Sequence, residues 1–209
     1  RNDPCCLDTD IPGIYGSSGF ADHLWHGSIV KYGDQLSLRK DQFYFRLCCS
    51  GVAACFGKEV LTQIDEAEFY ANIPALREKC GDRAVMRCIH FYQENARVPK
   101  QVEALEKGDF EEFLDLIKES GYSSYMYLQN VIPAGYTQHQ DMAIALALCE
   151  QYLQGKGAFR VHGGGFAGTV QAFVPFDLLD SFRAGIDGVL GQGACHVLSI
   201  RPQGGVEME

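Results

Sequence analysis

The residues with the clearest chemical potential form a glycine-rich segment in the last quarter of the chain. Its six residues are Gly163, Gly164, Gly165, Phe166, Ala167 and Gly168. Each glycine in a folded segment costs roughly 0.5–1 kcal/mol of backbone entropy relative to alanine, so four in six residues need a reason. A ligand that lies against bare main chain is one such reason. A tight hairpin that uses glycine only to relieve strain is the alternative.

Two better-known glycine loops do not fit the surroundings of this segment. The spacing satisfies the dinucleotide-binding pattern, but that loop must run from a strand into a helix, and residues 169–174 alternate like a strand. Val170 also completes the loop pattern of protein kinases. Those enzymes hold the phosphates with a lysine on the following strand, and this sequence has no lysine after Lys156. Both interpretations are therefore rejected.

The elements around the glycine segment follow from apolar periodicity. Residues 158–162 and 169–174 alternate as strands, with Val170, Ala172 and Val174 on one face. A helix opening at Pro175 and a last strand over 194–200 follow. The predicted buried residues of that helix are Leu178, Leu179, Phe182, Ile186 and Val189.

Three helices are predicted upstream. The first is capped by Asp82 and is kinked or broken at Pro99, whose ring clashes with the preceding turn. The second is capped by Asp109 and ends at Gly121. The third runs from Thr137 to Gly155, with an inner face of Met142, Ala145, Leu146, Cys149 and Leu153. This order predicts an α+β fold, a two-layer sandwich with helices packed on an antiparallel sheet.

The character of the sequence changes near residue 50. Residues 1–50 carry turn signals and no consistent buried face, whereas periodic patterns begin at Val52. We therefore divide the chain into residues 1–50 and 51–209. The first part is interpreted as a poorly matching N-terminal remnant that is disordered or misread, and the second as the folded domain.

Composition excludes several classes of partner. The net charge of −9 disfavours nucleic acid, and no apolar run reaches the roughly 18 residues that a membrane span needs. The nine cysteines offer no zinc-binding spacing. An odd number of mostly isolated thiols is typical of a reducing compartment, so we expect a cytoplasmic protein with no metal ligands of its own.

Three segments in order resemble one family of small-molecule kinases. Residues 160–168 (RVHGGGFAG), residues 90–98 (HFYQENARV) with the later Gly108-Asp109-Phe110, and residues 119–124 with Tyr127 are similar to C-terminal motifs of the GHMP kinase superfamily in its galactokinase form. The resemblance covers roughly residues 52–206. Pro99 and Gly121 depart from the usual family residues.

The resemblance implies a ferredoxin-like C-terminal domain and a function. The chain would be the C-terminal part of an ATP-dependent galactokinase, which transfers the γ-phosphate to the anomeric hydroxyl of galactose. The six glycine-segment residues would lie against the sugar and the nucleotide phosphates. The implied partners are a small-molecule sugar and ATP with Mg²⁺, whose ligands are expected from the largely missing N-terminal half.

The first fifty residues contain only faint counterparts of that missing half. Residues 11–21 weakly resemble the phosphate loop of the family, and Asp34 stands in a segment similar to its catalytic Asp-Gln pair. No catalytic residue is assigned, and the fragment is expected to be inactive alone. Two alternatives remain open: a non-catalytic sugar- or nucleotide-sensing module of kinase descent, and a GHMP kinase for another small alcohol.

Overall fold

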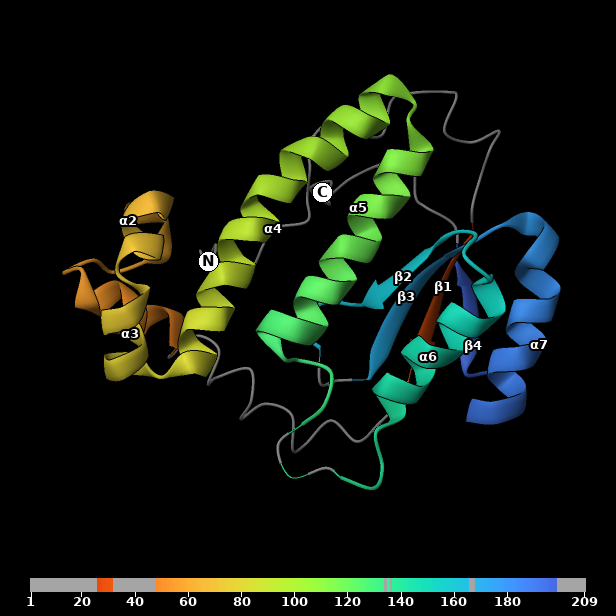
Figure 1. Cartoon of the computed structure of the whole chain (residues 1–209). Helices are drawn as coiled ribbons and strands as arrows, with labels where there is room; N and C mark the ends of the chain where they lie inside the picture. The colour runs from red at the N-terminus through yellow and green to blue at the C-terminus, as the bar shows by residue number, and fades with distance from the viewer. Residues whose placement is uncertain (1–25, 32–47, 134, 136, 166–167, 199–209) are drawn as a thin grey trace, which may run out of the picture.

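Four antiparallel strands form one sheet in the computed structural model, which describes residues 26–31, 48–133, 135, 137–165 and 168–198 (Figure 1). The strands are β1 (His26–Lys31), β2 (Ala158–Val161), β3 (Thr169–Val174) and β4 (Cys195–Leu198). Their order across the sheet is β2-β3-β1-β4. The antiparallel sheet predicted from the alternating segments is confirmed, and β2 and β3 form a hairpin around the glycine segment.

The strand β1 was not anticipated from the sequence. It lies between β3 and β4, with Ser28 opposite both Ala172 and Val197. Six residues of the N-terminal part thus belong to the sheet of the C-terminal part, while the division at residue 50 itself stays a prediction. Asp34 and residues 11–21 lie outside the described residues.

Helices make up most of the remaining described chain. Residues 48–55 are helical. The other helical elements are η2 (Leu61–Gln63), α2 (Glu66–Ala71), α3 (Ile73–Cys80), α4 (Asp82–Lys107), α5 (Phe110–Ser123), the π-helical turn η3 (Ser124–Leu128), α6 (Asp141–Leu153), η4 (Phe176–Leu178) and α7 (Leu179–Leu190).

The two faces of β3 contact different helices. Val170, Ala172 and Val174 share a core with α6 and α7, as their alternation predicted. The intervening Phe173 packs instead with Leu114 of α5. Helices α6 and α7 therefore cover one face of the sheet, and α5 packs on the other face at the β2 edge. The α+β class is confirmed.

A second core surrounds the first turns of α4, away from the sheet. Helix 48–55, α2 and α3 pack there against the first turns of α4 (Figure 1). Phe69 and Cys88 are fully buried in it. The long helix α4 therefore joins this small helical core to α5, which in turn contacts the sheet.

Pro99 does not break α4. The helix is continuous from Asp82 to Lys107 and contains Pro99 in its interior. Pro99 and residue Asn95, whose carbonyl loses its usual partner, are both exposed, so water can replace the missing hydrogen bond. Arg97 and Ala104, which are buried on either side of Pro99, hold the helix in place.

Several predicted helix ends shift in the structure. Helix α5 does cap on Asp109, whose carboxylate accepts from the Glu112 N–H at 3.1 Å. It continues beyond Gly121, however, and runs directly into η3. Helix α4 has Gly81 at its N-cap position, and the predicted cap Asp82 is the first helical residue and pairs with Arg77.

Two further expectations on the later helices are corrected. Helix α6 begins at Asp141, four residues after the predicted Thr137. Its inner face is confirmed, since Met142, Ala145, Cys149 and Leu153 are buried. In α7, Phe182 and Ile186 are buried as predicted, but Val189 is 56% exposed, because the next residue, Leu190, is the one that packs against the sheet core.

Candidate functional site

The glycine segment is a turn between two strands, not the entry to a helix. The N–H of His162 donates to the carbonyl of Thr169 at 2.9 Å, so the ladder of β2 and β3 extends to the mouth of the loop. Gly163 and Gly164 are exposed. Gly163 has φ +60° and open space within 4 Å of where a Cβ would stand. Bare main chain therefore faces outward at this point.

Gly165 contacts the protein itself. A Cβ at Gly165 would lie 2.3 Å from the carbonyl oxygen of Asn130 and 2.6 Å from its Nδ2. Gly165 also has φ +70°, a backbone conformation that is strained for other residues. A side chain at this position would therefore be both strained and in collision with Asn130. Gly168 is also buried and has φ +83°. Phe166 and Ala167 lie outside the described residues.

The π-helical turn η3 comes just before Asn130 and places this residue against the loop. The N–H of Gln129 donates to the carbonyl of Ser124 at 2.8 Å, five residues back, and Gln129 has φ +56°. Arg87 of α4 donates to the carbonyl of Leu128 at 3.2 Å and is itself only 1% exposed. Such turns are frequent at functional sites because they redirect the chain within a helix.

The side chain of Asn130 is buried without hydrogen bonds. It is 1% exposed, and neither its Oδ1 nor its Nδ2 has a partner in the described part of the chain. Leaving a buried amide unpaired costs about 1–3 kcal/mol of stability. The residue that contacts Gly165 of the glycine loop therefore carries an unpaired buried amide.

A cluster of charged and polar residues links β2 to α4 and α5. Glu94 of α4 accepts from the Ser120 hydroxyl at 2.6 Å and pairs with Arg97. Arg160 of β2 donates to the same Ser120 at 2.6 Å and lies 3.8 Å from Glu94. Burial lowers the pKa of the Arg160 guanidinium, an effect that Glu94 opposes. The exposed Glu119 adds a 3.5 Å contact to Arg97.

A neutral histidine borders this cluster. His90 Nδ1 lies 2.9 Å from the hydroxyl of Ser123. Burial lowers the pKa of His90 to about 4; Glu94 raises it, but Arg160 and Arg97 lower it further. His90 therefore adds no charge to the cluster at neutral pH.

The sequence did not predict this buried polar cluster, although it did point to the segments that contain its residues. Residues 90–98, 119–124 and 160–168 supply His90, Glu94, Arg97, Ser120 and Arg160. The available signal was that ionisable residues occupy positions on the buried side of α4, where an apolar residue is usual. Their partners lie 26 and 40 residues away, which the sequence does not reveal.

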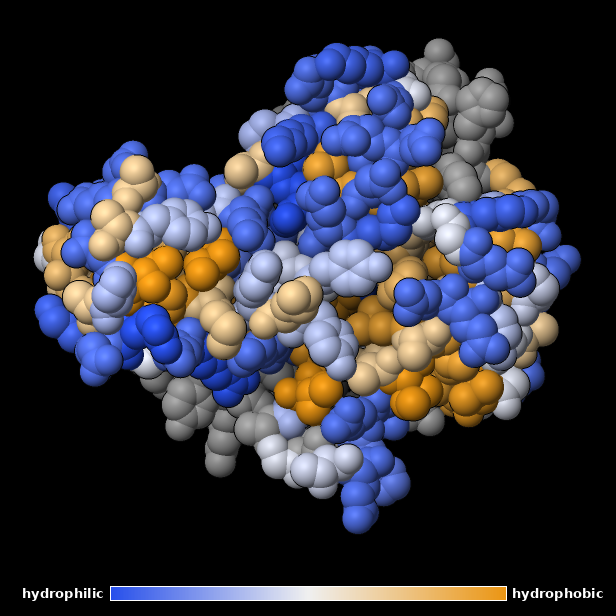
Figure 2. Space-filling view, viewed as in Figure 1, coloured by the Kyte–Doolittle hydropathy of each residue, from blue (hydrophilic) through white to orange (hydrophobic). Residues whose placement is uncertain are grey.

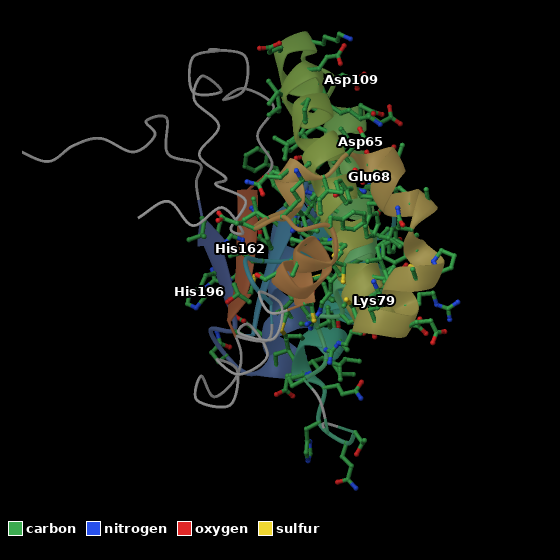
Figure 3. All side chains as sticks on the ribbon, turned by 90° about the vertical axis from the view of Figure 1, so that its left-hand side faces the viewer. Asp65, Glu68, Lys79, Asp109, His162 and His196 are labelled. Atoms are coloured by element: carbon green, nitrogen blue, oxygen red, sulfur yellow. The ribbon has the colours of Figure 1, made fainter. Side chains whose placement is uncertain are left out.

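Among the other ionisable groups, only some lie near the loop. Asp65 and Glu68 stand together at the first turn of α2, and His162 and His196 lie on the sheet side of the molecule (Figure 3). Asp65 caps α2, accepting from the Ala67 N–H at 2.9 Å. His162 is exposed beside the loop, where a ligand can reach it.

The visible face of the molecule is divided into hydrophilic and apolar regions. In Figure 2, hydrophilic residues cover the α4–α5 hairpin at the top, and apolar residues show at α2–α3 and around α6. Within the described ranges, no three His, Cys, Asp or Glu side chains converge to hold a metal. None of the described helices is both long and apolar enough to cross a bilayer.

Comparison with known proteins supports the resemblance seen in the sequence. No protein-family profile matches the chain. The galactokinase of Mannheimia succiniciproducens is 27% identical over 135 residues, which is 65% of this chain and 33% of that protein. The galactokinase of Glaesserella parasuis has the same identity and coverage. The match thus spans about a third of the length of these curated relatives.

A solved structure shares the fold. The crystal structure of Lactococcus lactis galactokinase complexed with galactose superimposes with a TM-score of 0.59, at 21% identity. The overlap covers 80% of this chain and 42% of that one. Sequence and fold together relate this chain to the C-terminal region of galactokinases.

Proposed function

We propose that this chain is the C-terminal part of an ATP-dependent galactokinase. In the proposed reaction, the anomeric hydroxyl oxygen of galactose bonds to the γ-phosphorus of ATP. The bond from that phosphorus to the β–γ bridging oxygen breaks, ADP leaves, and the hydroxyl proton passes to a base outside this chain. Similarity to galactokinases supports the reaction class.

The observation that carries the proposal is the exposed main chain of the β2–β3 turn. Gly163 and Gly164 are both exposed, and open space lies within 4 Å of the Cβ position of Gly163. Such groups can hold phosphate or hydroxyl oxygens at fixed positions without the entropy cost of ordering long side chains. Gly163, Gly164, Gly165, Phe166, Ala167 and Gly168 are the proposed binding segment.

The scaffold beneath the turn supports the same assignment. A binding loop must hold its geometry when the ligand arrives. Arg160 ties the end of β2 to α4 and α5 through Ser120 and Glu94, three residues before Gly163. The glycine loop therefore follows a strand, β2, that side-chain contacts hold in place.

The proposal leaves catalysis to the remainder of the parent protein. Magnesium would neutralise the transferring phosphate when bound, and its ligands are proposed to come from outside the described residues. Because the matched region is about a third of the relatives, we expect little or no turnover from these 209 residues alone. The proposed location is cytoplasmic, which fits the seven free thiols of the described residues.

A matched pair of glycine variants tests the proposal in the full-length protein. Gly163 and Gly155 both have positive φ and open space at the Cβ position, but Gly155 lies at the opposite end of β2. Asparagine tolerates this backbone conformation, so each variant adds a side chain with little strain. We expect Gly163→Asn to lower kcat/KM for galactose phosphorylation at least tenfold, and Gly155→Asn to leave it unchanged.

The same assay separates the alternatives. Galactose and ATP binding without ADP release by the full-length protein would favour a sensing module. ADP release with another small alcohol, but not with galactose, would favour a different substrate. Equal activity of the two asparagine variants would contradict the role of the loop.

A further inference from the structure

Asn130 and Gly165 are in contact, yet the polar atoms of the Asn130 side chain form no hydrogen bond. The amide of Asn130 carries a donor and an acceptor, both buried and both without partners in the described structure. It lies directly against Gly165, whose own N–H is a donor and whose carbonyl is an acceptor, the complement of the acceptor and donor of the amide. A leucine of similar size would fill the same space without burying a polar group.

Glycine at position 165 would allow the backbone to move so that the Asn130 amide gains hydrogen-bond partners. Gly165 has no Cβ, so its two peptide groups can rotate at low cost, whereas any other residue would collide with Asn130. Rotation about the φ and ψ bonds of Gly165 is the movement by which these peptide groups would pair with the amide. Asn130, on the other side of this contact, is held in place because Arg87 donates to the carbonyl of Leu128 in the preceding turn.

We propose that Asn130 is a positioning residue that holds the glycine loop in its ligand-bound geometry. When an oxygen-rich ligand binds at Gly163 and Gly164, the Gly165 peptide groups turn and pair with the Asn130 amide. The amide is then unpaired only in the free protein, so ligand binding and amide pairing reinforce each other. The ligand class rests on the proposed function: a sugar hydroxyl or a nucleotide phosphate.

The proposal predicts opposite effects on stability and on affinity. Asn130→Leu removes an unpaired amide from the free protein, so its thermal midpoint should equal or exceed that of the wild type. The same change removes the hydrogen bonds formed in the complex, so affinity should fall at least tenfold. A purely structural role would move both quantities in the same direction or leave affinity unchanged.

The experiment uses the full-length protein and three separate probes: ATP with Mg²⁺, galactose, and pyrophosphate. Thermal unfolding without ligand gives stability, and calorimetry gives the dissociation constants. Asn130→Asp keeps the shape of the side chain but loses the donor, so it should also weaken binding if the leucine variant fails to fold. Asn72→Leu, on the exposed connection between α2 and α3, is the matched control and should leave all affinities unchanged.

The outcomes separate this inference from the proposed function. Unchanged affinity in both Asn130 variants, or reduced stability with unchanged affinity, overturns the role of Asn130. A wild type that binds a probe but phosphorylates no sugar contradicts the proposed function, while its Asn130 variants still decide the positioning role. A wild type that binds none of the three probes contradicts both.

Discussion

Glu94 of α4 and Ser120 of α5 share a hydrogen bond of 2.6 Å, in which the serine hydroxyl donates to the carboxylate. Ser120 in turn accepts from Arg160, so this bond links two helices to the strand that leads into the glycine loop. Because Glu94 is only 4% exposed, its charge is needed to balance the two neighbouring arginines.

Replacing Glu94 should therefore destabilise the fold strongly. Glu94→Gln keeps the shape but leaves the arginines without their counter-charge, which costs about 3 kcal/mol in buried clusters. Chemical denaturation measures the difference. The control is Glu103→Gln on the same helix, whose exposed pair with Lys107 should contribute no measurable stability. Equal midpoints for the two variants would contradict the view of Glu94 as a buried counter-charge.

Gly121 should resist a substitution that normally stabilises helices. Alanine gains about 1 kcal/mol over glycine in an exposed helix interior. At Gly121, however, its Cβ would lie 3.0 Å from the Phe159 carbonyl oxygen and 3.2 Å from the Arg160 Cβ. We expect Gly121→Ala to give no gain or a loss, because α5 must move away from β2.

A second helical glycine provides the comparison. Gly188 of α7 is exposed and has no atom within 4 Å of its Cβ position, so Gly188→Ala should raise the unfolding midpoint. Differential scanning calorimetry on both variants tests the contrast. A similar gain at Gly121 would show that α5 and β2 are not held in close contact.

Stability should fall below neutral pH because of His90. The pKa of His90 is about 4 in the folded protein and about 6.5 when unfolded, so the unfolded state binds more protons between these values. His90 therefore contributes its full stability above pH 6.5 and loses it as the pH falls toward 4, a change of roughly 3 kcal/mol at most.

Denaturation at a series of pH values checks this slope. His90→Gln keeps a polar group near Ser123 and cannot titrate, so the dependence between pH 6.5 and 4 should flatten. His162→Gln, at an exposed position, should leave the slope unchanged. A wild-type slope retained in His90→Gln would assign the effect to other groups.

The glycines of the loop should differ in their effect on folding. Gly165→Ala places a methyl group 2.3 Å from the Asn130 carbonyl in addition to the backbone strain, so we expect a loss of about 2–3 kcal/mol. Gly163→Ala meets open space and should lose only the strain, about 1 kcal/mol. Urea titration distinguishes them, and equal losses would contradict the close approach of Asn130 to the loop.

The sequence by itself determined the local elements and the glycine hairpin. Alternation of Val170, Ala172 and Val174 predicted both the strand and its buried face, and Asp109 predicted a helix start. These features depend on side chains within a few residues of each other, so their pattern is visible along the chain. The three linked motifs also gave the kinase resemblance.

Only the tertiary structure decided which residues support the loop. β1 is a central strand whose partners lie 138 or more residues later in the chain, so its pairing is not visible in the local sequence. Glu94 with Arg160, and Asn130 with Gly165, meet through the packing of α4, α5 and β2. Pro99 stays inside α4 because buried neighbours outweigh its local preference. Contacts between distant segments depend on how the elements pack, and no spacing along the chain encodes them.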